Sequence, residues 1–350
     1  MLQFPSGVIA DRIGSVQVII IGAILTGIGS LIVAINSSVI ILAVGMIIIG
    51  VGTGVHKTVT IGLLSRTYKN NTGRIFGIFD TIGSYGGVGA PTIATLFLVA
   101  PDPISMVLSN ILGANWRGVF FLSGFIVIGL AAVFVFIVDS GTIVSGKNSR
   151  ENDTPSLTDY INQFKNKRFI IFVMITILFS FSYNGIISFL PLYLTEEVGF
   201  SNSSANILYS LVFVVSFVQI ITGDLSDRVG ELIIIVGALF IASLSLVLLI
   251  TLAQQNIVLL GGILILYSLG SNGFRPVRSL YLIKILPDSI TSGGLGTVRT
   301  LLMGAGSIAP MIVGSLADSV NFQFAFIILS TFLLMSAVLA GVLLINEYYN

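Results

Sequence analysis

Long apolar runs separated by short polar segments dominate this chain. Many of the runs extend over about 20 residues, the length that an α-helix needs to cross the hydrocarbon core of a membrane. Because lipid offers no hydrogen bonds to an open backbone, we interpret these runs as membrane-spanning helices. The predicted spans cover residues 15–35, 39–64, 75–99, 118–138, 169–193, 204–222, 232–253, 257–283, 294–315 and 323–345.

The composition agrees with an all-α integral membrane protein. The 350 residues are 55% hydrophobic and 9% charged, and the mean hydropathy is +1.05, which excludes an ordinary soluble domain. The net charge of +1 gives no sign of nucleic-acid binding, and the absence of cysteine excludes disulfides and thiolate metal sites. We therefore expect a monomer in the lipid bilayer, with no nucleic-acid partner, metal or cofactor.

One charged motif occurs twice. Gly7–Gly14 reads Gly-Val-Ile-Ala-Asp-Arg-Ile-Gly, and Gly223–Gly230 repeats its pattern. We predict two tight turns, with glycines where the backbone bends. The residues of this conformational motif are Gly7, Asp11, Arg12, Gly14, Gly223, Asp227, Arg228 and Gly230.

At this motif the sequence resembles the major facilitator superfamily of secondary transporters. In that family, G-x-x-x-D-R-x-G and a basic pair join the second and third helices, whereas Ser15 and Val16 follow here. The resemblance implies two pseudo-symmetric helical bundles and a contact between Asp11 and the start of the helix near Gly294. It also implies that Met1–Ser6 is a stump of the second helix and that the first helix is missing.

An internal repeat extends beyond the charged motifs. One constant offset aligns Gly54–Pro91 with Gly273–Pro310, with identical glycine, threonine, alanine and proline positions. Two similar halves joined by a polar segment match the parallel repeats of such transporters. We predict a truncated N-terminal bundle at 1–138, a cytoplasmic linker at 139–168 and a six-helix bundle at 169–350.

The basic residues predict the orientation. Most of the 16 Lys and Arg lie on the side of the first charged motif, which is cytoplasmic by the positive-inside rule. This places the linker and the C-terminus in the cytoplasm of a multi-pass protein of the plasma membrane.

Ionisable residues inside spans are functional candidates because they are expensive to bury in lipid. They are His56, Lys57, Asp80, Arg275, Arg278 and Arg299. Asp80 either pairs with Lys57 or carries a transported proton, and Arg299 either binds substrate or pairs with Asp80. His56 and Lys57 either bind substrate or make helix contacts, and Arg278 either acts in the cavity or extends to the headgroups.

The basic groups in the spans outnumber Asp80, so an anionic small-molecule substrate is the simplest source of compensating charge. Polar residues on the helices that line the family's cavity complete the predicted site. The candidate substrate-binding residues are His56, Lys57, Tyr183, Asn184, Ser271, Arg275 and Arg299, and the candidate proton-coupling residue is Asp80.

The glycine-rich run Gly83–Pro91 partly resembles a fifth-helix motif of drug–proton antiporters. The segment from Gly52 to Pro91 is also similar to exporters of the fosmidomycin-resistance type. These resemblances favour efflux.

The leading hypothesis is a secondary transporter that works by alternating access. Because the chain has no nucleotide-binding loop, we expect an ion or proton gradient to drive it, with protons as the favoured ion, unless it is a uniporter. A truncated, inactive remnant of such a transporter is the first alternative. A membrane-embedded enzyme is the second, and the absence of a histidine-rich metal cluster and of a serine nucleophile with a nearby base argues against it.

Overall fold

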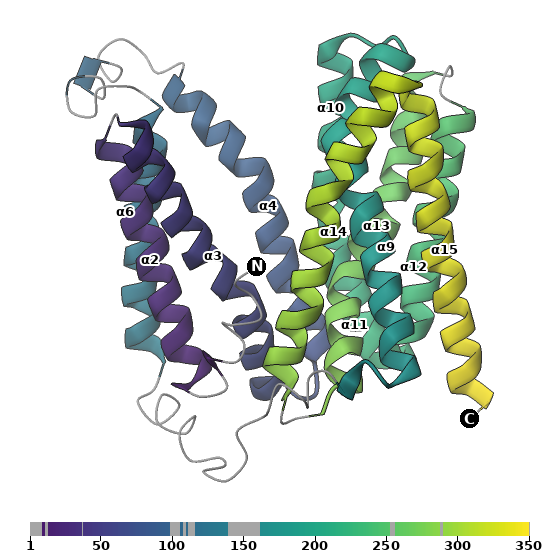
Figure 1. Cartoon of the computed structure of the whole chain (residues 1–350), viewed down its shortest axis with the longest axis horizontal. Coiled ribbons are helices and arrows are strands. Elements are labelled where there is room, and N and C mark those ends of the chain that lie inside the picture. The colour runs from purple at the N-terminus through teal and green to yellow at the C-terminus, as the bar shows by residue number, and fades with distance from the viewer. Residues whose placement is uncertain are drawn as a thin grey trace. The chain divides into compact units, whose positions relative to one another are not determined.

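The computed structural model describes residues 9–10, 13–36, 38–98, 106–107, 110, 116–138, 162–252, 256–287 and 290–349. Within these residues the chain is helical and contains no strand (Figure 1). The predicted stump at residues 1–6 and most of the predicted linker lie outside the described residues.

Nine of the ten predicted spans correspond to one helix each, with ends that differ by a few residues. The helices are α2 (Ser15–Ile35), α3 (Val39–Thr67), α4 (Thr72–Leu98), α6 (Arg117–Ile137), α9 (Lys167–Leu192), α10 (Asn202–Val214), α11 (Val218–Val229), α12 (Glu231–Thr251), α13 (Ile257–Ile285), α14 (Thr291–Ser319) and α15 (Phe322–Tyr349). The predicted span 204–222 is divided between α10 and α11, and α11 continues to Val229.

Nine spans in the described part of the chain are long and apolar enough to cross a membrane, counting α9 and α10 together with their continuations. They include every predicted span except that of α4, which carries Arg74 and Asp80. The protein is therefore a multi-pass membrane protein.

Two spans contain irregular turns. Pro191 lies near the end of α9, and the chain continues as the π-helical turn η1 (Tyr193–Glu197). Between α10 and α11 the chain tightens into the 3₁₀ turn η2 (Val215–Phe217). Proline removes a helical donor, so a change of helix type beside Pro191 has a local cause.

Polar residues at three helix starts act as caps. Asn166, Ser201 and Asn256 accept hydrogen bonds from backbone N–H groups two or three residues further along α9, α10 and α13. These side chains satisfy donors that have no partner within the helix. The polar residues between the apolar runs thus determine where these helices begin.

The chain divides into two compact units. Unit 1 comprises residues 1–63, 89–156 and 289–297, and unit 2 comprises residues 64–88, 157–288 and 298–350. Unit 2 therefore holds the last residues of α3, the first part of α4 and the helices from α9 onward, except for the start of α14, which belongs to unit 1. Each unit is a helical bundle.

In unit 1, glycines let α2 approach its neighbours. A Cβ atom on Gly27 of α2 would lie 3.1 Å from the carbonyl oxygen of Gly124 on α6, and one on Gly29 would lie 2.9 Å from that of Gly45 on α3. Small residues at such positions bring helix backbones close enough for dispersion contacts, which drive helix packing in lipid.

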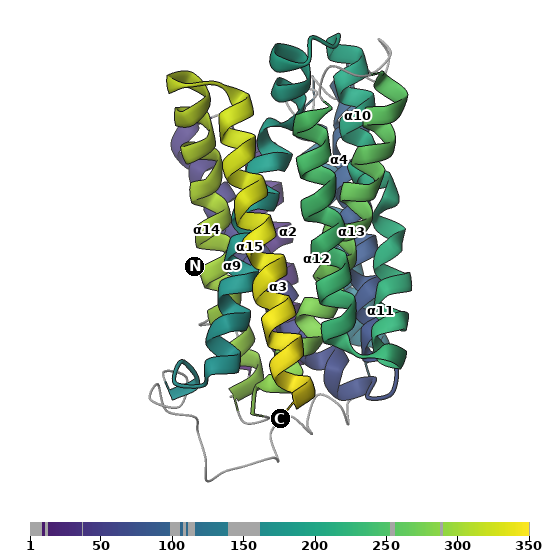
Figure 2. The ribbon, with the colours of Figure 1, turned by 90° about the vertical axis from the view of Figure 1, so that its right-hand side faces the viewer.

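In unit 2, α12 packs against both α13 and α15, and α15 also packs against α9 (Figure 2). Buried hydroxyl groups connect these helices. Ser180 and Ser182 of α9 donate to the carbonyl oxygens of Leu302 on α14 and Leu329 on α15, at 2.7 and 2.8 Å. Such bonds contribute about 0.6 kcal/mol each on average between membrane helices.

We predict that Gly52→Ala destabilises the protein. Its new methyl group would lie 2.5 Å from the carbonyl oxygen of Gly22 and 2.6 Å from the backbone nitrogen of Thr26, so α2 and α3 would have to separate. Overpacking of this kind typically costs about 1–3 kcal/mol. Thermal unfolding of the purified protein in detergent measures the effect.

Gly50→Ala is the matched control on the same helix, because no heavy atom lies within 4 Å of the position of its Cβ. Equal melting temperatures of the two variants would contradict the proposed role of Gly52 in packing.

Candidate functional site

Arg275 is the centre of a polar network in unit 2. Its Nη1 donates to Ser84 Oγ on α4 at 3.2 Å and to Asn272 Oδ1 on its own helix at 3.3 Å. Its guanidinium carbon also lies 5.7 Å from the ring centroid of Tyr183 on α9, a cation–π distance. The structure thus brings together Tyr183 and Arg275, two residues of the predicted binding site.

Ser84 connects three helices. It donates to the backbone oxygen of Asp80 at 2.8 Å and accepts from both Arg275 and Gln219 Nε2, the latter at 3.0 Å. Gln219 lies on α11 and is completely buried. Gln219 was not among the predicted site residues, although an amide side chain in an otherwise apolar span is a detectable signal.

Asn272 holds the opposite side of the Arg275 guanidinium. Its amide nitrogen donates to the backbone oxygen of Val212 and to Ser268 Oγ, both at 2.9 Å. Because these two bonds use the nitrogen, the amide oxygen faces Arg275. The orientation of Arg275 is therefore set by residues of α4, α10 and α13.

Three charged residues form a second, more deeply buried group in unit 2. Asp80, Arg278 and Arg299 are 3%, 7% and 8% exposed. Asp80 and Arg275 lie within electrostatic range of both Arg278 and Arg299. This group is contributed by α4, α13 and α14.

Within the described part of the chain, Arg278 has an aromatic neighbour and Arg299 has an enclosed donor. The guanidinium carbon of Arg278 lies 5.8 Å from the ring centroid of Phe274. The enclosed Nε of Arg299 has no hydrogen-bond partner among the described residues. A buried donor without an acceptor costs about 1–3 kcal/mol.

The structure describes the side chains of some of the other predicted binding residues but not of all of them. Ser271 is completely buried on α13, and Asn184 donates to the backbone oxygen of Ser180 at 2.8 Å within α9. His56 and Lys57 belong to α3, but their side chains lie outside the described residues. The predicted pairing of Lys57 with Asp80 therefore stays a prediction.

The second charged motif differs from the predicted turn. Residues 223–229 are the last part of α11, and only Gly230 departs from the helix, with φ 99° and ψ 146°. Gly14 of the first copy has nearly the same conformation, with φ 101° and ψ 140°. Positive φ favours glycine, so the final glycine of each motif makes the bend. Gly7, Asp11 and Arg12 lie outside the described residues.

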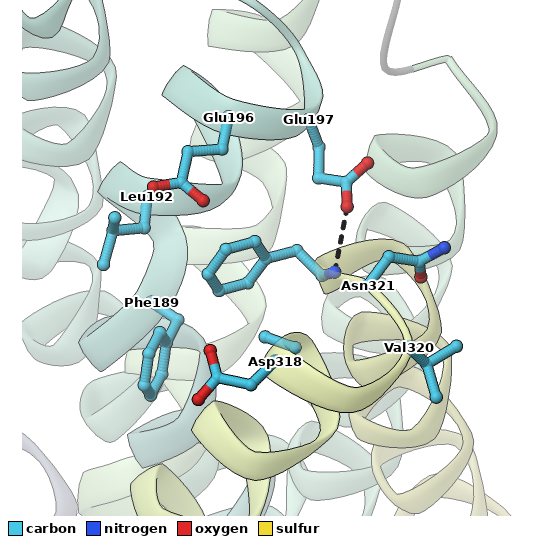
Figure 3. A pocket seen from close by; sticks show the side chains of 9 residues that line it. Phe189, Leu192, Glu196, Glu197, Asp318, Val320 and Asn321 are labelled. Atoms are coloured by element: carbon cyan, nitrogen blue, oxygen red, sulfur yellow. Dashed lines mark hydrogen bonds between the residues drawn. The ribbon is translucent and has the colours of Figure 1, made fainter.

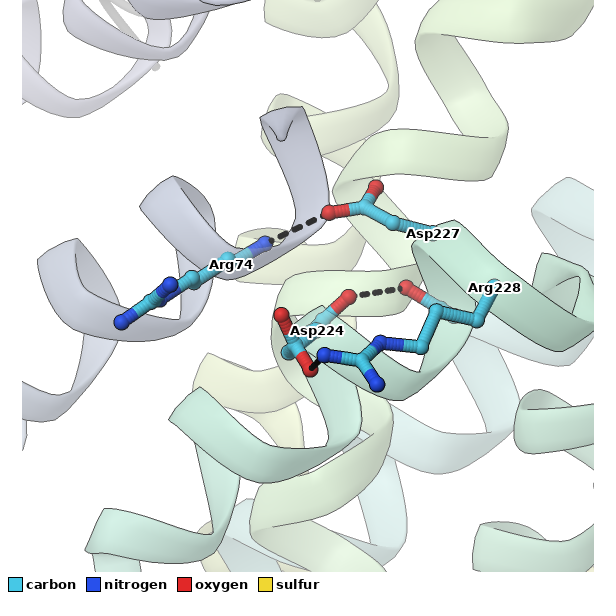
Figure 4. Close-up of polar contacts among 6 residues, drawn as sticks. Arg74, Asp224, Asp227 and Arg228 are labelled. Atoms are coloured by element: carbon cyan, nitrogen blue, oxygen red, sulfur yellow. Dashed lines mark hydrogen bonds and ion pairs between the residues drawn. The ribbon is translucent and has the colours of Figure 1, made fainter. Parts of the chain in front are cut away.

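Asp227 caps the start of α4. Its two carboxylate oxygens accept from the backbone N–H groups of Gly73 at 2.9 Å and Arg74 at 3.1 Å (Figure 4). The carboxylate satisfies two donors that the helix cannot satisfy and lies at the positive end of the helix dipole. This is the type of contact that the resemblance implied for Asp11, observed here for the second copy.

Glycines make the Asp227 contact geometrically feasible. A Cβ on Gly223 would collide with the carbonyl oxygen of Gly73, and a Cβ on Gly77 would collide with that of Gln219. The first glycine of the motif therefore allows α4 and α11 to touch, rather than bending the chain as predicted. Among the described residues, Arg228 forms an exposed 2.8 Å ion pair with Asp224, a type of contact that contributes little stability.

A cavity of about 480 Å³ lies elsewhere in unit 2, where η1 faces the connection between α14 and α15 (Figure 3). Glu196, Glu197 and Asp318 line it. Glu197 accepts a hydrogen bond from the backbone N–H of Phe322 at 2.9 Å and thus caps α15. No group of His, Asp or Glu that could hold a metal occurs in the described part of the chain.

Known proteins resemble this chain in sequence. The family model described as "Major Facilitator Superfamily" matches residues 1–271 and again residues 175–349. A Haemophilus influenzae protein described as "Putative metabolite transport protein" is 24% identical over 251 residues, which cover 67% of this chain and 58% of that protein. The match thus spans less than two thirds of the curated relative's length.

Solved structures resemble the chain in fold. The fucose:proton symporter of E. coli has a TM-score of 0.78 at 17% identity, covering 98% of this chain and 87% of that one. The human organic anion transporter has a TM-score of 0.71 at 16% identity, covering 97% and 80%. At these identities the likeness concerns the fold alone.

We predict that Asp227→Ala destabilises the contact between α4 and α11. The change leaves the N–H groups of Gly73 and Arg74 without their acceptors, and loss of a helix cap typically costs about 0.5–2 kcal/mol. Thermal unfolding in detergent, together with hydrogen exchange of the first turn of α4, measures the loss.

Asp224→Ala is the control, because it removes a carboxylate from the same helix that contacts only the exposed Arg228. Asp227 would not stabilise the start of α4 if both variants unfolded at the wild-type temperature and the amide hydrogens in the first turn of α4 exchanged at the same rate in all three proteins.

Proposed function

This chain belongs to the Major Facilitator Superfamily, and we propose that it is a secondary active transporter that moves a small molecule across the membrane by alternating access. The two helical bundles and the many apolar helices support this function over the membrane-embedded enzyme. The chain lacks a nucleotide-binding loop, so an ion gradient must drive transport.

We propose that the substrate carries an anionic group that binds to Arg275. The observation that supports this proposal is the hydrogen bonding of the Arg275 guanidinium group. Ser84 and Asn272 both contact Nη1, so neither bond uses the edge formed by Nε and Nη2. That edge can bind a carboxylate or phosphate through two parallel hydrogen bonds. The structurally similar human protein is described as an organic anion transporter.

We propose protons as the coupling ion and Asp80 as the proton-carrying residue. Asp80 is the acidic side chain of α4 and is almost fully buried. An intramembrane carboxylate changes its protonation when its surroundings alternate between dry and wet. The structurally similar E. coli protein is described as a fucose:proton symporter.

Export is the proposed direction, supported by the glycine-rich run Gly83–Pro91. The basic-residue bias supports a plasma-membrane orientation with the C-terminus in the cytoplasm. The predicted domain boundaries and the monomeric state belong to the same proposal. Substrate accumulation into inverted vesicles tests the direction, and a reporter fused to the C-terminus tests the orientation.

We predict that Arg275→Lys and Arg275→Gln both weaken binding of an anionic substrate. Lysine keeps the charge but cannot form two parallel bonds, and glutamine also loses the charge. Breaking a desolvated charged contact costs about 2–5 kcal/mol, so affinity should fall by more than about tenfold. Uptake of the transported compound into proteoliposomes at several concentrations measures the change.

Arg228→Lys is the matched control, since this arginine is exposed. It lies in the last turn of α11, whereas Gln219 lies in the first turn. A cationic transported compound, or unchanged affinity in both Arg275 variants, would make Arg275 a structural residue.

We predict that Asp80→Asn uncouples transport from the proton gradient. Asparagine cannot carry a proton between the two sides, so accumulation driven by a pH difference should disappear while substrate exchange continues. Proteoliposomes assayed with and without a pH gradient separate the two activities. Asp224→Asn is the control, and gradient-driven accumulation by Asp80→Asn would exclude Asp80 as the coupling residue.

A further inference from the structure

Gln219 is a completely buried amide in the first turn of α11. Its Nε2 donates to Ser84 Oγ on α4 at 3.0 Å, and its Oε1 is enclosed without a hydrogen-bond partner among the described residues. A buried acceptor without a donor is unfavourable, so an apolar side chain of similar size would suit the packing of α11 against α4 better. The amide therefore points to a role other than packing.

The hydrogen bonds of Ser84 explain why an amide donor is needed at this position. The Ser84 hydroxyl donates to the backbone oxygen of Asp80 at 2.8 Å, which leaves two lone pairs on Oγ. These accept from Gln219 Nε2 at 3.0 Å and from Arg275 Nη1 at 3.2 Å. Ser84 thus forms all the hydrogen bonds that a hydroxyl group can form, and the bond from Gln219 helps to hold Oγ beside Arg275.

The second acceptor of Arg275 Nη1 is equally fixed. Asn272 Oδ1 accepts from Nη1 at 3.3 Å, while the Asn272 amide nitrogen donates to the backbone oxygen of Val212 and to Ser268 Oγ, both at 2.9 Å. Nη1 therefore bonds to two acceptors whose own positions are set by further hydrogen bonds. This arrangement leaves the edge formed by Nε and Nη2 in a defined direction.

We propose that Gln219 is a positioning residue for substrate binding: through Ser84 it holds the Arg275 guanidinium in the plane in which that edge meets a carboxylate of the substrate. Two parallel hydrogen bonds require the guanidinium and the carboxylate to be nearly coplanar. Without Gln219, the Ser84 side chain can rotate to another rotamer and Arg275 loses a fixed acceptor. This inference rests on the anion site proposed for Arg275.

The decisive variant is Gln219→Met, which keeps the length of the side chain and removes its hydrogen-bonding groups. Uptake into proteoliposomes at several concentrations gives the KM and the maximal rate for the transported compound. Acetate, the smallest carboxylate probe, is tested by inhibition of the same uptake. We expect Gln219→Met to raise both the KM and the inhibition constant of acetate about fivefold, the worth of one hydrogen bond, at an unchanged maximal rate.

A double-mutant cycle tests whether Gln219 acts through Ser84. Ser84→Ala should weaken acetate binding at least as much as Gln219→Met does. In the Ser84→Ala background, Gln219→Met should weaken it no further, because the connection to Arg275 is already broken. Additive losses in the double variant would mean that Gln219 affects binding by another route, and the proposal would be wrong.

Thermal unfolding of the ligand-free full chain in detergent separates positioning from a structural role. Gln219→Met removes the unpaired Oε1 and leaves Ser84 bonded to Asp80 and Arg275, so the melting temperature should stay equal or rise. If Gln219 mainly stabilised the contact between α4 and α11, the melting temperature would fall. Gln219→Leu serves as the second apolar variant, and lower melting temperatures in both would overturn the proposal.

Thr81→Val is the matched control. Thr81 is buried on α4, and its Oγ1 donates to the backbone oxygen of Ser216 in η2 at 3.2 Å. The change removes a hydrogen bond between neighbouring segments of the same interface without touching Ser84. Its KM and acetate inhibition should equal those of the wild type, and a loss as large as that of Gln219→Met would assign both effects to helix packing.

The proposed anion site and the role of Gln219 fail in different ways. Wild-type KM and acetate inhibition in Gln219→Met, together with weakened binding in Arg275→Gln, would overturn the positioning role and leave the anion site intact. If acetate did not inhibit uptake by the wild type, or if Arg275→Gln bound both compounds as the wild type does, the anion site itself would be wrong and the role of Gln219 with it.

Discussion

The backbone contact between α4 and α11 determines which polar side chains of unit 2 meet. Gly73 and Gly223 have no Cβ, and the carbonyl oxygen of each lies where a Cβ of the other would be. At this separation Asp227 reaches the first N–H groups of α4, and Gln219 reaches Ser84. Lipid provides no replacement partner for the buried Gln219 amide, so its bond to Ser84 is kept only while the two helices stay in contact.

The same part of unit 2 contains groups that fold stability does not explain. Hydroxyl and amide groups around Arg275 are paired across helices, whereas the arginines at positions 278 and 299 are buried. Apolar residues would be cheaper there. Retention of costly charges on neighbouring helices is typical of substrate and ion pathways in membrane proteins.

Parts of the site follow from the sequence through helical spacing. Arg275 and Arg278 share one face because they lie three residues apart on a predicted helix, and Tyr183 was assigned to the same cavity as Arg275. The roles of Gln219 and of Ser84 could not be predicted, since each depends on a partner on a different helix. The role of Gly223 was misassigned because close packing and bending both favour glycine.

The sequence alone determined the helical class, the approximate positions of the spans and the repeat of the charged motif. These features depend on local chemistry, namely apolar length, capping side chains and the positive φ of Gly14 and Gly230. Only the tertiary structure decided that Asp227 caps α4 and that Ser84 contacts both Gln219 and Arg275. Such pairings depend on which helices touch and at what depth, and apolar periodicity is nearly the same on every helix in lipid.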